Sequence, residues 1–181
     1  WFNQGQVCCA GSRLLVQENV ADRFYAKLKA RMKALRVGDP LDKAIDVGAI
    51  VDPSQLAQIK AKVDANTAGE TFQCDAPDGC FYPPTLITGL APSDPLMQEE
   101  IFGPVLTLTP FDDEEEAVAI ANGTDYGLVA GVFTQNIDRA MRCARDLQAG
   151  QVFVNEWYAG GVETPFGGYR KSGFGREKGV E

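Results

Sequence analysis

Short apolar segments of strand length alternate with segments of helical periodicity along this chain, and that alternation restricts the possible folds most. Helices that separate consecutive strands favour parallel strand pairing, and a parallel sheet is covered on both faces. The expected fold is therefore α/β: a mainly parallel, layered sheet with helices on both faces, formed by residues 1–181. Strands are expected at residues 14–16, 71–74, 105–108, 128–133 and 151–154, and helices at 19–35, 53–63, 113–121 and 136–147.

Local sequence patterns also predict which face of the first helix is buried and where one extended segment lies. Asn19 offers a side-chain cap to the first helix, where Phe24, Leu28, Met32 and Leu35 recur at helical spacing and predict one buried stripe. The segment 82–87 contains two prolines, which lack the N–H that a central strand donates, so it is expected at a sheet edge or as extended chain.

The composition excludes several kinds of site and location. The chain has no histidine, so it cannot form a Ser-His or Cys-His couple or a histidine-bearing metal centre, and no metal site is expected. No apolar run approaches the roughly 18 residues that a membrane helix needs. Its five cysteines are an odd number in a chain too large to need disulfides, which predicts a reducing, cytoplasmic location.

Charge is distributed unevenly along the chain. The net charge is −8, and the 76 residues between Lys62 and Arg139 contain fourteen acidic residues and no basic one. This acidic middle is interpreted in two ways, as steering for a cationic ligand or as a solvated face. Neither suits nucleic acid, which requires dense Lys/Arg contacts to phosphate.

The segment Phe2-Asn3-Gln4-Gly5-Gln6-Val7-Cys8-Cys9-Ala10-Gly11-Ser12-Arg13 is chemically distinctive. Small residues beside a cysteine allow close substrate approach, and a loop between helix and strand can direct backbone N–H groups at an oxyanion. A nucleophilic thiol and a buried structural cysteine both fit these residues when they are considered alone.

Three blocks together resemble the NAD(P)-dependent aldehyde dehydrogenases. Phe2 to Arg13 is similar to the cysteine signature of that family, and in its G-Q-x-C pattern the nucleophile is Cys8. The run Glu99-Glu100-Ile101-Phe102-Gly103-Pro104-Val105 matches E-E-I-F-G-P, and Pro165 to Gly173 is similar to P-F-G-G-x-K-x-S-G, with Arg170 at the position of the lysine. Asn122 to Gly127 is similar to a fourth stretch, so the resemblance extends over essentially the whole chain.

The resemblance implies a mechanism that needs neither histidine nor metal. Cys8 would attack an aldehyde, a hydride would pass to NAD or NADP, and a glutamate-activated water would hydrolyse the thioester to a carboxylic acid. Glu100 and Phe102 would contact the nicotinamide ribose and ring. The implied walls of the substrate pocket are Phe2, Val7, Cys9, Gly160 and Phe166.

The family resemblance also implies what this chain lacks. The coenzyme-binding domain, the general base and the oxyanion asparagine belong upstream of the cysteine loop, and a C-terminal association segment belongs downstream. Residues 1–181 are therefore expected to be the catalytic domain of a longer protein, inactive alone and homo-oligomeric, as a dimer or tetramer, in full-length form. The partner is a small aldehyde, and the choice between NAD and NADP rests with the absent domain.

Three alternatives remain open at this point. A related reductase would transfer the acyl group to coenzyme A or start from an acyl phosphate. A domain of another class would serve only subunit association, with an idle cysteine. Within the dehydrogenase interpretation, Glu156 or Glu163 could act as a local base, and Glu163 could favour a cationic aldehyde.

Overall fold

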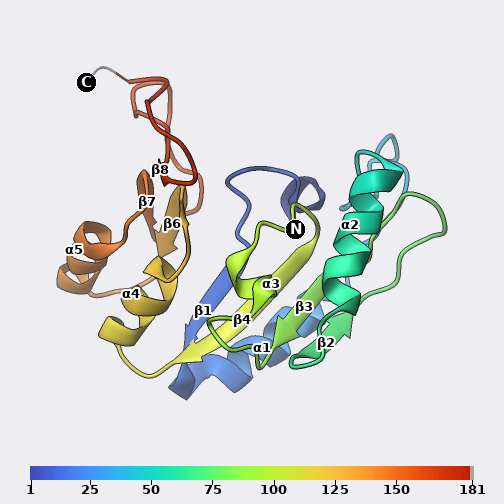
Figure 1. The fold of residues 1–181 in the computed structure, drawn as a ribbon, viewed down its shortest axis with the longest axis horizontal. Helices are drawn as coiled ribbons and strands as arrows, with labels where there is room; N and C mark the ends of the chain where they lie inside the picture. Colours follow the sequence, from blue (N-terminus) through green and yellow to red (C-terminus); the bar gives the residue numbers. More distant parts are fainter. Residues whose placement is uncertain (180–181) are drawn as a thin grey trace. The chain divides into compact units, whose positions relative to one another are not determined.

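The computed structural model describes residues 1–179, and the chain divides into two compact units, Trp1–Asp112 and Asp113–Glu181 (Figure 1). The first unit contains a four-stranded sheet in the order β1-β4-β3-β2. In this sheet β4 runs parallel to both of its neighbours, and β2 is antiparallel to β3. Its elements are η1 (Phe2–Gly5), β1 (Arg13–Gln17), α1 (Glu18–Met32), α2 (Pro53–Asp64), β2 (Glu70–Gln73), β3 (Thr85–Thr88), α3 (Pro95–Gln98) and β4 (Val105–Phe111).

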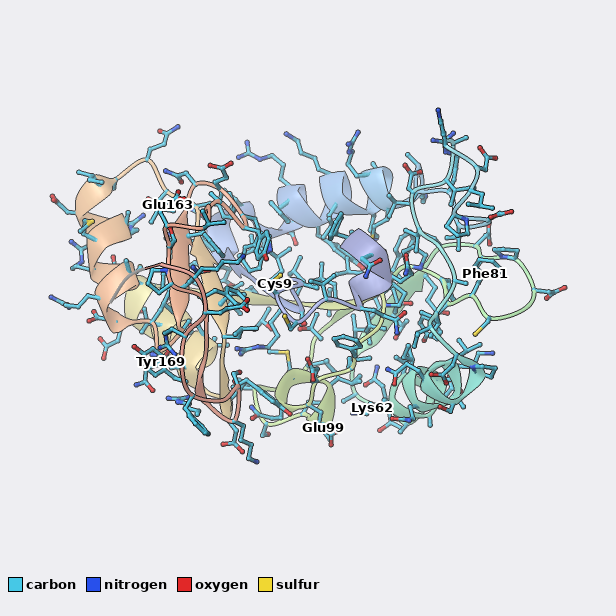
Figure 2. The ribbon with its side chains drawn as sticks, turned by 90° about the horizontal axis from the view of Figure 1, so that it is seen from above. Cys9, Lys62, Phe81, Glu99, Glu163 and Tyr169 are labelled. Atoms are coloured by element: carbon cyan, nitrogen blue, oxygen red, sulfur yellow. The ribbon has the colours of Figure 1, made fainter. Side chains whose placement is uncertain are left out.

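Helices cover both faces of this sheet. Helix α1 packs on β1 and β4 from one side, and Figures 1 and 2 show α2 and α3 on the other. The core beneath α1 is formed by Val16, Met32, Leu86 and Leu108, which are at most 6% exposed.

The bounds and the buried face of α1 differ from those predicted from the sequence. The helix begins at Glu18 after Gln17, so Asn19 lies inside the first turn and does not cap it. Tyr25 packs towards the core, whereas Phe24 is 40% exposed. Met32 is the last helical residue and is fully buried, and Leu35 lies beyond the helix.

The extended segment with two prolines is central rather than at an edge. Strand β3 begins at Thr85, directly after Pro83 and Pro84, and pairs with β4 on one side and β2 on the other. The Thr85 N–H donates to Pro104 O at 2.8 Å. Because both prolines precede the first ladder position, their missing N–H groups cost the sheet nothing.

The second unit contains two strand pairs and two helices. Strands β6 and β7 are parallel, β5 and β8 are antiparallel, and α5 packs on α4 and on both strands of the parallel pair. The side chain of Asn136 caps α5, since it accepts from the Arg139 N–H. The elements are α4 (Glu114–Asn122), β5 (Tyr126–Gly127), β6 (Val129–Val132), α5 (Ile137–Asp146), β7 (Gln151–Val154) and β8 (Tyr169–Arg170).

The predicted α/β class is confirmed, with a mixed rather than uniformly parallel arrangement of strands. The strand pairs β1–β4, β3–β4 and β6–β7 are parallel, and the pairs β2–β3 and β5–β8 are antiparallel. Within the described part of the chain, no helix is long and apolar enough to cross a membrane.

Candidate active site

The two adjacent cysteines occupy the centre of a tight turn. The Ala10 N–H donates to Val7 O at 2.8 Å, which places Cys8 and Cys9 at the two central positions. Cys8 is exposed, whereas Cys9 is 6% exposed. Burial, followed by the neighbouring Cys8, raises the pKa of the Cys9 thiol. The turn therefore exposes Cys8 and directs Cys9 into the unit.

A left-handed turn precedes the cysteines. Asn3, Gln4 and Gly5 have consecutive φ angles of 49°, 57° and 71°. The left-handed region costs a residue other than glycine about 1–2 kcal/mol, so the surrounding contacts must hold this segment. Two such residues, Asn3 and Gln4, lie five and four positions before the candidate nucleophile Cys8, and backbone strain commonly clusters at functional sites.

The first and second sequence blocks meet at their glycines. A Cβ added at Gly5 would overlap Gly103 O and lie 2.6 Å from Gly103 C and 3.2 Å from Pro104 N. Only a glycine at position 5 therefore allows the two backbones to approach this closely. The structure thus brings the cysteine loop against the segment that contains Glu100 and Phe102.

Side chains of helix α2 bind the backbone of the second sequence block, residues 99–105. The Gln55 side chain donates through Nε2 to Ile101 O and Phe102 O, both at 3.1 Å. Lys62 Nζ lies 2.7 Å from Glu99 Oε2 and donates to Glu100 O at 3.2 Å; Lys62 and Glu99 are labelled in Figure 2.

The two predicted cofactor-binding residues lie on the surface of this unit. Phe102 has a φ of 53° and is 37% exposed, and Glu100 is exposed. The neighbouring Glu99 pairs with Lys62. The segment therefore offers one aromatic ring and one carboxylate next to the cysteine loop.

The remaining predicted pocket residues are divided between the units. Phe2 is 84% exposed and lies in η1, and Val7 begins the cysteine turn. In the second unit, Gly160 and Phe166 line a pocket that Tyr158 and Lys178 also border. Phe166 exchanges backbone hydrogen bonds with Glu177, at 2.7 and 2.9 Å.

The sequence analysis did not identify an aromatic cluster in the second unit. The ring of Phe153 lies 5.9 Å from that of Trp157 and 6.3 Å from that of Tyr158, which in turn lies 6.3 Å from Phe166. Lys178 Nζ is 5.8 Å from the centre of the Phe166 ring. The only local signal was the adjacent pair Trp157-Tyr158 just after a strand.

Among residues 1–179, no group of three or more His, Cys, Asp or Glu residues is arranged to hold a metal ion. Glu163 is exposed in the second unit, where Figure 2 labels it.

Curated relatives match nearly the whole chain. The chain is 40% identical over 184 residues to a betaine aldehyde dehydrogenase from Cereibacter sphaeroides (strain ATCC 17029 / ATH 2.4.9), covering 99% of this chain and 38% of that protein. It is also 40% identical over 191 residues to 4-trimethylaminobutyraldehyde dehydrogenase A from Danio rerio, with the same coverage. The chain thus spans less than two fifths of these relatives.

Solved structures show the same fold. An NAD-dependent aldehyde dehydrogenase from Sinorhizobium meliloti is 37% identical with a TM-score of 0.95, and the match covers 99% of this chain and 37% of that one. A betaine aldehyde dehydrogenase from Staphylococcus aureus in complex with NAD+ is 36% identical with a TM-score of 0.91 and the same coverage. The family model that matches residues 1–181 is described as "Aldehyde dehydrogenase family". The chain belongs to the aldehyde dehydrogenase family.

Proposed function

We propose that residues 1–181 are the catalytic domain of an NAD(P)-dependent aldehyde dehydrogenase that oxidises an aldehyde to a carboxylic acid, with Cys8 as the nucleophile. The observation that carries this proposal is the turn in which Cys8 is exposed and Cys9 buried, in a loop whose Gly5 lies against Gly103 of segment 99–105. The family relationship supports the same assignment.

The chemistry follows from a thiolate and a hydride acceptor. The Cys8 sulfur adds to the carbonyl carbon, and the carbonyl oxygen becomes an oxyanion that the Cys8 backbone N–H stabilises. Loss of hydride converts this thiohemiacetal into a thioester. Water then attacks the thioester, releasing the acid and regenerating the thiol. An amide side chain and a glutamate base outside this chain complete the site.

The residues of segment 99–105 fit a nicotinamide dinucleotide. A carboxylate such as Glu100 accepts hydrogen bonds from ribose hydroxyls, and the half-exposed ring of Phe102 offers an apolar surface to the nicotinamide. When bound, NAD(P) supplies the hydride acceptor. Structural relatives solved with NAD+ support NAD, and NADP stays an alternative.

The proposed pocket walls are Phe2, Val7, Cys9, Gly160 and Phe166. The names of the relatives from Cereibacter and Danio indicate aldehydes that contain a trimethylammonium group. A quaternary ammonium binds over aromatic faces, and the cluster of Phe153, Trp157, Tyr158 and Phe166 offers such faces. We therefore propose a quaternary ammonium aldehyde as substrate. Glu163 and the acidic middle would contribute to steering the cation, and the alternative is that they are solvated surface.

The proposal extends to the full-length protein, since this chain spans only about 38% of its relatives. We propose a cytoplasmic homo-oligomer, a dimer or tetramer, whose remaining sequence supplies the coenzyme domain. The isolated chain would show no turnover.

The decisive experiment compares two adjacent cysteines in the full-length polypeptide. Cys8→Ser is expected to reduce the rate of NADH formation from betaine aldehyde by at least about a thousandfold. Cys9→Ser, as the matched control, is expected to keep measurable activity. Full activity in Cys8→Ser would refute the assignment and favour the association-only alternative. Product that forms only with coenzyme A would favour the acylating reductase.

A further inference from the structure

Two glutamine side chains connect the segment before Cys8 to residues 48–51. Gln4 Oε1 accepts from the Gly48 N–H at 3.1 Å, and Gln6 Oε1 accepts from the Val51 N–H at 3.0 Å. The two carboxamides therefore join the same short segment from positions on either side of Gly5. Neither glutamine has a role in the chemistry proposed above.

Residues 48–51 are themselves fixed by further hydrogen bonds, to Cys80. The Ile50 N–H donates to Cys80 O at 2.8 Å, and the Cys80 thiol donates to Ile50 O at 3.4 Å. Ile50 is 3% exposed and Gly48 is buried. The two glutamines thus accept hydrogen bonds from a segment that other hydrogen bonds already fix.

The backbone that they hold is strained. Gln4 has a φ of 57° and sits between Asn3 and Gly5 in the left-handed turn. The Gln6 N–H closes this turn on Asn3 O at 2.9 Å, and Asn3 Nδ2 donates to Gln6 O at 3.0 Å. Without contacts to another part of the unit, a left-handed stretch of this kind would relax towards ordinary φ angles.

From these contacts we propose that Gln4 and Gln6 are positioning residues for the cysteine turn. They fix the left-handed segment against residues 48–51, so that the turn beginning at Val7 keeps Cys8 exposed and Cys9 buried. The importance of this arrangement for catalysis rests on the proposed role of Cys8.

The two glutamines are expected to contribute unequally. The Gln4 bond is partly buried and ends on a buried residue, Gly48. The Gln6 bond is exposed, and Gln6 Nε2 is a buried donor with no hydrogen-bond partner in the described residues. Replacing Gln6 by methionine removes that unpaired donor along with the bond, which offsets part of the loss.

The test is cysteine-specific labelling of the full-length polypeptide with iodoacetamide, followed by peptide mapping of the cysteines in residues 1–181. Gln4→Met preserves side-chain volume and removes the acceptor, and Gln4→Glu keeps an acceptor oxygen. Loss of the hydrogen bond from Gly48, together with the longer exposed bond from Gln4 Nε2 to Asn3 Oδ1, is expected to raise the labelling rate of Cys9 by about two- to tenfold in Gln4→Met. Gln6→Met is expected to give a smaller increase, and Gln4→Glu a rate close to that of the wild type.

The labelling rates of Cys74 and Cys143 distinguish a positioning role from a general loss of stability, because unfolding exposes both of these thiols together with Cys9. The proposal is supported if only Cys9 labelling rises. It is overturned if Cys9 labelling is unchanged, if the three rates rise together, or if Gln4→Glu behaves like Gln4→Met. Rapid hydrogen exchange of the Gly48 amide in the wild type would also overturn it. Because labelling involves no turnover, these outcomes are independent of whether Cys8→Ser is inactive.

Discussion

The close approach of Gly5 to Gly103 leads to a stability prediction with an internal control. In Gly5→Ala the new Cβ would overlap Gly103 O and lie 2.6 Å from Gly103 C. In Gly89→Ala the φ is 76°, similar to the 71° at Gly5, but no atom lies within 4 Å of the added Cβ. The two variants therefore share the left-handed penalty and differ in the steric overlap.

The magnitudes follow from these two contributions. Alanine in the left-handed region costs about 1–2 kcal/mol, which is the whole effect expected at Gly89. The overlap at Gly5 involves backbone atoms that cannot rotate away, and overpacking of this kind adds about 1–3 kcal/mol. Gly5→Ala should therefore lower the free energy of unfolding by about 2–5 kcal/mol.

Urea unfolding of the 181-residue chain measures this difference, with far-UV circular dichroism for the backbone and tryptophan emission as a second signal. Trp1 reports on the first unit, because its Nε1 donates to Thr85 O at 3.3 Å. Equal destabilisation by Gly5→Ala and Gly89→Ala would refute the close approach between the cysteine loop and segment 99–105.

Three further predictions concern the supports of the two units. Gln55→Met removes both hydrogen bonds to Ile101 O and Phe102 O and should cost about 1–2 kcal/mol in urea unfolding. This cost should exceed that of losing the exposed Lys62–Glu99 ion pair in Glu99→Met, which leaves the bond from Lys62 to Glu100 O in place. Asn136→Ala removes the side-chain cap of α5 and should cost about 1 kcal/mol; Gln135→Ala, one residue earlier, should have little effect in the same assay. The hydrogen bond from Arg142 lowers the pKa of Glu114, so this carboxylate stabilises the folded state above its unfolded pKa and loses that contribution as pH falls through the folded value. The destabilisation caused by Arg142→Met should therefore shrink in acid, and a constant difference between pH 7 and pH 3 would contradict this assignment.

Local signals predicted the starts of α2 and α5, which depend on short-range contacts. Asp52 accepts from the N–H groups of Ser54 and Gln55, and Asn136 accepts from the Arg139 N–H, so the caps of α2 and α5 lie within three residues of their partners. A cap of this kind is determined by the sequence that surrounds it.

The face of α1 could not be predicted in the same way. Phe24 and Tyr25 are adjacent aromatics, and each lies on a helical stripe with Leu28 and Met32. The sheet selects the stripe that contains Tyr25, whose ring also lies 4.2 Å from Lys29 Nζ. Periodicity alone cannot distinguish the stripes, because the choice depends on strands distant in sequence.

The same distinction explains what the sequence reveals about the candidate site. Cys8, Glu100 and Phe102 were recognised by residue type within long motifs. Gln55 was not, because its hydrogen-bond partners are backbone carbonyls, which carry no side-chain identity. Motifs therefore indicate candidate side chains for the chemistry, but not the side chains that fix the backbone around them. It follows that a substitution in α2, more than forty residues from Cys8 and outside every motif, can displace the segment that contains Phe102.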